Sequence, residues 1–116
     1  MVVVDAVILE KAVRGVRALE RWGHVRAAFL FGSQVQGGTD EWSDIDVAAF
    51  VEGAEQWDFH RLSRACADAQ RRGGRRVELH ILPAASYESP LRASFSQYIL
   101  QHGMRLDLNG FKSDAA

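Results

Sequence analysis

The sequence places two carboxylates one residue apart, in the tripeptide Asp44-Ile45-Asp46. The stretch from Asp44 to Val51 predicts a β-strand, and side chains at positions i and i+2 of a strand point to the same face. Both carboxylates would then lie about 7 Å apart along the chain, close enough for their oxygens to hold hard cations between them. An alternative stays open, in which Asp44 ends the preceding loop and only Asp46 lies in the strand, solvated at the end of the sheet.

A Gly-Ser dipeptide stands ten residues before these aspartates. The short apolar run Val25 to Phe31 predicts a buried strand, and Gly32-Ser33 follows where that strand gives way to a turn. A glycine at such a point lets backbone N–H groups approach a phosphate closely, and Ser33 adds a hydroxyl donor. The dipeptide alone is an ordinary turn, so its place before the aspartates carries the signal.

Glu78 supplies a third carboxylate. It lies in the stretch Arg75 to Leu82, which predicts a strand because apolar residues alternate with Glu78 and His80. A carboxylate between apolar neighbours must face solvent or join a polar site. If the two acidic strands are neighbours, the three carboxylates lie together beside the Gly-Ser turn. The turn could then bind a phosphate while the carboxylates bind two metal ions. This arrangement indicates transfer of a phosphoryl or nucleotidyl group from a nucleoside triphosphate.

The other expected elements are helices that would support these strands. Their apolar periodicity and capping residues predict a helix after Asp5 that stops at Gly23, one over Trp57 to Arg72, and one opened by Ser89-Pro90 that runs to about His102. The segment Gln34 to Ser43 is expected to be a polar, Gly-rich connection. Whether Val2 to Val4 form a further short strand stays open.

Length and composition limit the possible classes of protein. The 116 residues, 47% of them hydrophobic, predict one α/β domain over residues 1–116 with a frayed tail from 107 to 116. A net charge of -1 argues against nonspecific electrostatic binding of nucleic acid, and no apolar stretch is long enough to span a membrane. We expect a cytoplasmic protein, in which the lone Cys66 is a buried helix residue aligned with Phe59, Leu62 and Ala69.

Several other side chains give weaker signals. The four histidines lack the spacing of metal ligands, so surface or packing roles are expected, although His80 shares a face with Glu78 and could border the cleft. Trp42 precedes the aspartates and is expected either to pack or to stack on a nucleobase or contact a partner. The arginines near the end of the second helix are expected to be a solvated helix end or to contact an acidic partner.

The pattern of Gly32-Ser33, ten residues, then Asp44-Ile45-Asp46 resembles that of the minimal nucleotidyltransferases, small members of the nucleotidyltransferase superfamily. Glu78 stands at the place of the family's third acid, and Ile99 to Leu106 looks like its closing helix and exit. The resemblance implies a truncated nucleotidyltransferase fold, a small mixed β-sheet flanked by helices. It also implies an ATP site with two Mg²⁺ ions.

The resemblance also implies a role for each site residue. Gly32 and Ser33 would hold the β and γ phosphates, Asp44 and Asp46 would bind both metals, and Glu78 would complete the second metal site and help deprotonate the acceptor hydroxyl. The chain has Gln36 where the family commonly has a basic residue, and Glu78 where it often has aspartate.

Relatives of this kind are frequently antitoxins paired with a HEPN-type toxin, and some transfer AMP to a tyrosine of that toxin. The resemblance therefore implies transfer of AMP from ATP to a hydroxyl of a partner protein. The alternative is a catalytically silent antitoxin that blocks its partner by occlusion. The sequence leaves the acceptor and the oligomeric state open.

Overall fold

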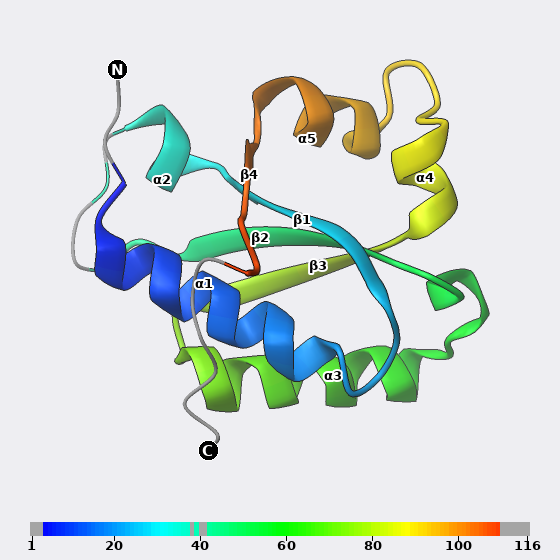
Figure 1. The fold of residues 1–116 in the computed structure, drawn as a ribbon, viewed down its shortest axis with the longest axis horizontal. Helices are drawn as coiled ribbons and strands as arrows, with labels where there is room; N and C mark the ends of the chain where they lie inside the picture. The colour runs from blue at the N-terminus through cyan, green and yellow to red at the C-terminus, as the bar shows by residue number, and fades with distance from the viewer. Residues whose placement is uncertain (1–3, 38, 40–41, 110–116) are drawn as a thin grey trace.

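A computed structural model describes residues 4–37, 39 and 42–109 of the chain. Helices and strands alternate along it, with short helical turns between several of them (Figure 1). The elements are α1 (Ala6–Leu19), β1 (Val25–Phe31), α2 (Ser33–Gln36), β2 (Ile45–Val51), the 3-10 turn η1 (Ala54–Gln56), α3 (Phe59–Gly73), β3 (Val77–Pro83), α4 (Ala84–Glu88), α5 (Phe95–His102) and β4 (Met104–Arg105).

The strands form one four-stranded sheet in the order β3-β2-β1-β4. β2 pairs antiparallel with β1 and parallel with β3, and β1 pairs antiparallel with the short β4. The parallel pair is possible because α3 makes the long crossover between β2 and β3. The expected small mixed sheet flanked by helices is therefore confirmed.

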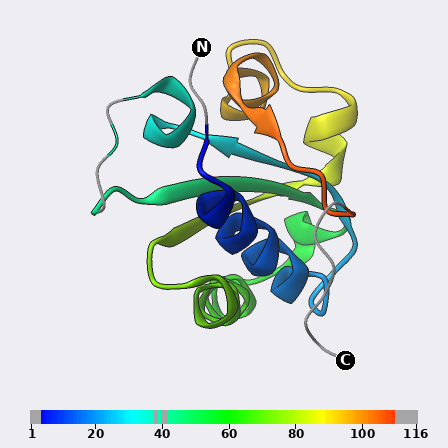
Figure 2. The same ribbon diagram turned by 60° about the vertical axis from the view of Figure 1, so that its left-hand side comes forward.

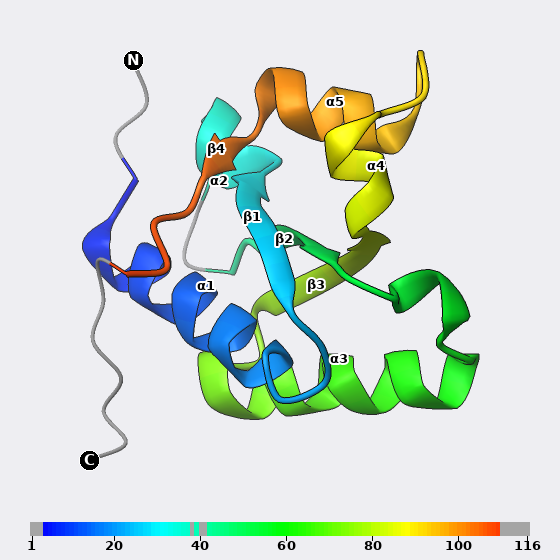
Figure 3. The same cartoon turned by 45° about the vertical axis from the view of Figure 1, so that its right-hand side comes forward.

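Helices cover the two faces of the sheet unequally. α1 and α3 lie side by side on one face, where α1 buries Val13, Val16 and Leu19 against the sheet (Figure 2). α4 and α5 lie across the other face, where Ile99 of α5 packs against a second cluster that contains Phe29 and Phe50 (Figure 3). Because strand side chains alternate between faces, Asp46, Glu78 and His80 all belong to the face of α4 and α5.

Aspartates cap the first two long helices, and α3 begins at Phe59 rather than at the predicted Trp57. Asp5 Oδ1 accepts a hydrogen bond of 2.7 Å from the Val7 N–H, and Asp58 caps α3 in the same way through the Arg61 N–H. Gly23 is not the helix stop, since α1 ends at Leu19. A Cβ at Gly23 would lie 2.9 Å from both Trp57 and Val51, so this glycine instead allows close packing of the turn after α1.

The prediction of one helix opened by Ser89-Pro90 is wrong. The chain forms α4 directly after β3, turns through Ala93 at a φ of 61°, and begins α5 after Ser94. The Ser94 Oγ accepts from the Gln97 N–H, and the Gln97 side chain accepts from the Ala93 N–H. This reciprocal pattern is close to a capping box and fixes the start of α5 five residues later than predicted.

Other boundaries also differ from the sequence analysis. The connection Gln34 to Ser43 begins with the one-turn helix α2, β3 starts at Val77 rather than Arg75, and Phe59 is 82% exposed instead of buried. Residues 110–116 of the predicted frayed tail and Val2 and Val3 of the possible strand lie outside the described residues, and Val4 is in no strand. Within the described ranges, no helix is long and apolar enough to cross a membrane.

Candidate metal and phosphate site

The Gly32 turn reaches the first carboxylate of the site. Gly32 has φ 75° and ψ -149°, a conformation open to glycine, and its carbonyl accepts from the N–H groups of Val35 and Gln36. A Cβ at Gly32 would lie only 2.7 Å from Asp46 Oδ2. The absence of a side chain thus lets the turn lie against the carboxylate, with the half-buried Ser33 immediately after it.

The sheet brings Asp46 and Glu78 together. In the parallel register of β2 and β3, Asp46 lies opposite Glu78 and Ala48 lies opposite His80. On its other side Asp46 lies opposite Phe31, the last residue of β1 before the Gly32 turn. The expectation that the two acidic strands are neighbours is confirmed, because β3 returns parallel beside β2.

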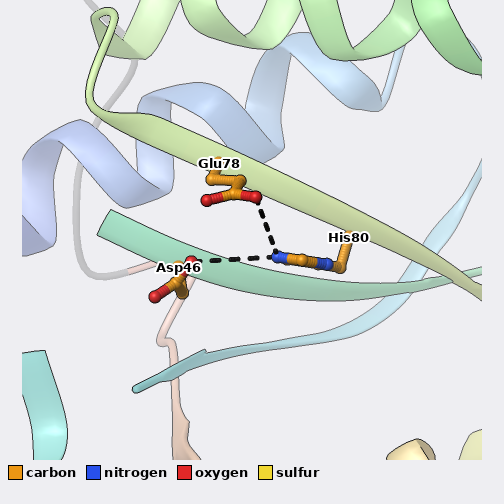
Figure 4. A group of neighbouring side chains, drawn as sticks. All are labelled: Asp46, Glu78 and His80. Carbon is orange, nitrogen blue, oxygen red and sulfur yellow. Dashed lines mark ion pairs between the residues drawn. The ribbon is translucent and has the colours of Figure 1, made fainter. Parts of the chain in front are cut away.

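His80 joins these two carboxylates. Its Nε2 atom lies 3.8 Å from Asp46 Oδ1 and 3.9 Å from Glu78 Oε1, between the two side chains (Figure 4). One ligand atom from each residue lies within 4.8 Å of the other two. His80 was expected at most to border the cleft, and its position two residues after Glu78 on the same strand face was the available signal.

Asp44 lies outside this cluster. It is exposed and stands one residue before β2, so the expectation that it belongs to the strand is wrong, and the alternative that it ends the loop describes its position. Its carbonyl accepts from Gln34 Nε2, while the next N–H, of Ile45, donates to the Arg76 carbonyl. These bonds tie the chain to the β1–β2 connection and to β3 at the point where β2 begins.

The surroundings of Glu78 disfavour the charged form of its carboxyl group. Partial desolvation raises the pKa of Glu78, the negative charges of Asp46 and Asp44 and a hydrogen bond with Asp46 raise it further, and His80 opposes them. Asp44 is therefore close enough for its charge to act on the site. A cation beside Glu78 would relieve this repulsion.

Aromatic rings hold the imidazole in place. The His80 ring centroid lies 5.2 Å from that of Phe31 and 5.7 Å from that of Phe95, the first residue of α5. α5 is also tied to α2, because Gln36 Nε2 donates to the Tyr98 hydroxyl at 3.0 Å. The closing helix therefore supports both the phosphate turn and the acidic cluster.

Most of the residues that gave weaker signals in the sequence pack or form hydrogen bonds within the fold. The Cys66 thiol lies 3.7 Å from the Leu79 carbonyl and burial raises its pKa, which fits packing against β3. Arg71 pairs with Asp68 and Arg76 donates to the Ser43 carbonyl, so the basic residues near the end of α3 also hold the fold together. Trp42 is 81% exposed, and its stacking on a nucleobase stays a prediction.

The donor set suits a divalent cation. Asp46 and Glu78 offer the carboxylate oxygens that Mg²⁺ prefers, and His80 Nε2 is buried with no hydrogen-bond partner among the residues that the structure describes. A buried nitrogen of this kind is rarely left unsatisfied. The residues present therefore fit a metal ion held beside the Gly32 turn.

The chain resembles known nucleotidyltransferases in sequence and in fold. The family model described as "Polymerase beta, Nucleotidyltransferase" matches residues 16–104, more than half of the chain. The crystal structure of a proposed nucleotidyltransferase from Sulfolobus solfataricus is similar, with a TM-score of 0.55 and 18% sequence identity over 70% of this chain and 71% of that one. This second likeness is one of fold. No curated protein matches the chain in sequence.

Proposed function

The chain belongs to the Polymerase beta nucleotidyltransferase family, and from this premise we propose that it transfers AMP from ATP to a hydroxyl group of a partner protein. The observation that carries the proposal is the pairing of Asp46 with Glu78 in the sheet, directly against the Gly32 turn. Nucleotidyl transfer requires a phosphate-binding turn directly beside a cation site, because the metal must contact the phosphates.

The proposed roles are those that the resemblance implies, and the positions of Gly32, Asp46 and Glu78 support them. Gly32 and Ser33 would bind the triphosphate, Asp46 and Asp44 would hold Mg²⁺, and Glu78 would complete a second metal position. Bound Mg²⁺ would neutralise charge on the triphosphate. The acceptor oxygen would form a bond to the α-phosphorus as the bond to pyrophosphate breaks, and Glu78 would take the hydroxyl proton.

We further propose that the partner is a HEPN-type toxin and that the chain is its antitoxin, as the resemblance implies. Exposed apolar side chains in and before α5 support a protein acceptor. Phe95 and Tyr98 of α5 are 41% and 38% exposed, Phe95 contacts His80, and Leu91 in the turn before α5 is 78% exposed. A protein docked here would bring its side chains next to Glu78.

One observation favours a second candidate, a silent antitoxin that acts by occlusion. Gln36 stands where relatives commonly carry a basic residue, and its amide is bound to the Tyr98 hydroxyl. This position therefore brings no positive charge to the triphosphate. A binding module would keep the fold and the exposed apolar residues but would not transfer AMP to its partner.

Labelled ATP distinguishes the two candidates. The purified chain is incubated with the toxin, Mg²⁺ and ATP that carries label at either the α or the γ phosphate. The enzyme transfers the α label to the toxin and not the γ label, and Asp46→Asn abolishes this transfer. A tight complex with no α label on the toxin would identify the binding module and refute the transferase.

A further inference from the structure

We propose that His80 Nε2 is itself a ligand of the metal, together with Asp46 and Glu78, and that it makes the site prefer divalent transition ions such as Mn²⁺ or Co²⁺ over Mg²⁺. This inference rests on the cation site of the proposed function and adds a nitrogen ligand to it. It assigns His80, which has no role in the proposed transfer, to direct contact with the ion.

The distances carry the first step. Separations of 3.8 and 3.9 Å from Nε2 to the two carboxylate oxygens are too long for N–H···O hydrogen bonds. Ligand bonds to small divalent ions measure about 2.0–2.2 Å, so neighbouring ligand atoms around one ion lie about 3–4 Å apart. In Figure 4 the His80 nitrogen is therefore spaced from each carboxylate as one ligand is from another around a common centre, and not as a hydrogen-bond donor.

The burial of His80 Nε2 is the second argument for a bound ion. The His80 ring as a whole is 35% exposed, yet its Nε2 atom is buried and makes no hydrogen bond to any described residue. Such an atom lacks the interactions it would have in water, which is unfavourable unless something binds it. Phe31 and Phe95 pack against the ring, so the nitrogen is held toward the carboxylates.

The chemistry of the donor set carries the third step. Carboxylate oxygens alone suit Mg²⁺, whereas an imidazole nitrogen suits first-row transition ions, whose affinity for a nitrogen-containing site rises from Mn²⁺ toward Cu²⁺. Replacing one oxygen ligand by His80 therefore shifts preference away from Mg²⁺. The rival role for His80 is that of a protonated counterion between the two carboxylates.

The two roles predict opposite effects of removing the imidazole. A counterion competes with the metal, so its loss strengthens binding of every cation, Mg²⁺ included. A ligand contributes to binding, so its loss weakens binding, most of all for the transition ion. The sign of the change thus separates them.

Calorimetric titration of the full chain with Mn²⁺ and with Mg²⁺ measures this sign in wild type, His80→Gln and His60→Gln, the last removing an exposed imidazole from α3 on the opposite face of the sheet. Losing even an outer partner of a metal ligand typically costs about 10–100-fold in metal affinity, so His80→Gln should weaken Mn²⁺ binding by about 10-fold or more. Mg²⁺ affinity should change less, and His60→Gln should match the wild type. Stronger or unchanged Mn²⁺ binding by His80→Gln overturns the proposal.

A spectroscopic measurement keeps the test independent of how the variants fold. Pulsed electron paramagnetic resonance on the wild-type chain with Mn²⁺ should detect the hyperfine coupling of one directly bound imidazole nitrogen, and its absence overturns the proposal. Asp46→Asn separates this inference from the proposed function. If Asp46→Asn leaves binding of both ions intact, the cation site itself is refuted. If Asp46→Asn weakens both ions while His80→Gln weakens neither, only the role of His80 is refuted.

Discussion

At the scale of single residues, the site depends on the absence of one side chain. Gly32 combines a positive φ with an approach to Asp46 that leaves no room for a Cβ. The two requirements have different consequences, because the backbone conformation affects stability whereas the approach to Asp46 affects the site. Gly53 offers a comparison at a similar φ of 78°, with a ψ of 1° in the left-handed helical region, and nothing lies within 4 Å of its Cβ position.

We expect Gly32→Ala to weaken binding of Mg²⁺-ATP strongly and Gly53→Ala to leave it unchanged. Both variants should lose stability, each by about 1–2 kcal/mol, because alanine is strained at positive φ. The loss should be larger for Gly32→Ala, whose new methyl also pushes against Asp46. Urea denaturation measures the stability of both variants, and calorimetry measures their affinity for Mg²⁺-ATP. Equal ATP affinities would show that the nucleotide binds away from this turn.

Glu78 gives a second prediction, on the rate of transfer. Glu78→Gln removes the charge with little change of volume, so transfer of α label should fall by about 10²–10⁴-fold, the usual contribution of a general base. Mg²⁺-ATP affinity should change little if Asp46 and Asp44 hold the nucleotide's metal. Glu78→Asp restores the charge and should recover part of the rate. If the Asp variant is as inactive as the Gln variant, the carboxylate's reach, or a structural role, matters more than its basicity.

At the scale of elements, the sequence predicted those whose signals are local. Val25–Phe31 is a strand with the predicted bounds, and the helix predicted after Asp5 begins there. The start of α5 was missed because Ser89-Pro90 is a stronger local signal than Ser94, whose cap depends on Gln97 reaching back to Ala93. Local patterns cannot show which of two such caps tertiary packing selects.

In the candidate site, too, the sequence predicted only what local patterns determine. Asp46 and Glu78 were identified from alternation along their own strands, but that they lie opposite each other depends on the register of β2 with β3. The bounds of β2 and the closeness of His80 to the carboxylates were not predicted. β2 begins at Ile45, whose N–H donates to the Arg76 carbonyl, and the register with β3 brings His80 to Asp46. Contacts between distant segments determined both outcomes.

The packing of α1 against α3 gives a third prediction, on pH. Asp68 of α3 is buried and lies 3.3 Å from Trp22 Nε1 and 2.9 Å from Arg71 Nη2. Desolvation alone would raise the pKa of Asp68, but its hydrogen bonds with Arg71 and Trp22 and the charge of Arg21 hold the pKa below the ordinary value of 3.8. The stabilisation is therefore present above the ordinary pKa and is lost as the pH falls through the lowered one.

We expect Asp68→Asn to lower the free energy of unfolding at neutral pH by about 1.5–3 kcal/mol, the range for a hydrogen bond to a charged group. The difference from the wild type should begin to shrink as the pH falls through the ordinary pKa of 3.8, and it should vanish below the lowered pKa, where the folded wild-type carboxyl is also neutral. Urea denaturation at several pH values measures it. A difference that stays constant down to acid pH would mean that charge at Asp68 contributes nothing to the packing of these helices.

At the scale of the whole molecule, the two faces of the sheet have different tasks. α1 and α3 cover one face and bury the larger core cluster, while α4 and α5 lie across the other face (Figure 3), on which Asp46 and His80 are partly exposed and Glu78 is exposed. Each face also carries exposed apolar side chains. Leu91 is 78% exposed beside α5, and Phe59 is 82% exposed at the start of α3.

These two residues give a final prediction, on partner binding. If the acceptor protein docks over the site, Leu91→Asp should weaken the complex with the toxin by about 30-fold or more, as expected for a residue contributing 2 kcal/mol or more at an interface. Transfer of α label should fall in parallel, since the acceptor hydroxyl is no longer held near Glu78. Calorimetry of ATP binding should give the wild-type affinity, because Leu91 is outside the proposed nucleotide site.

Phe59→Asp is the matched control, because it adds the same charge to an equally exposed apolar residue on the opposite face of the sheet. It should leave both the complex and the transfer unchanged. The reverse result, a complex broken by Phe59→Asp and kept by Leu91→Asp, would put the toxin on the face of α1 and α3. From there its hydroxyl groups would be separated from Glu78 by the sheet. Direct transfer to the bound toxin would then be impossible, and only inhibition by occlusion would remain.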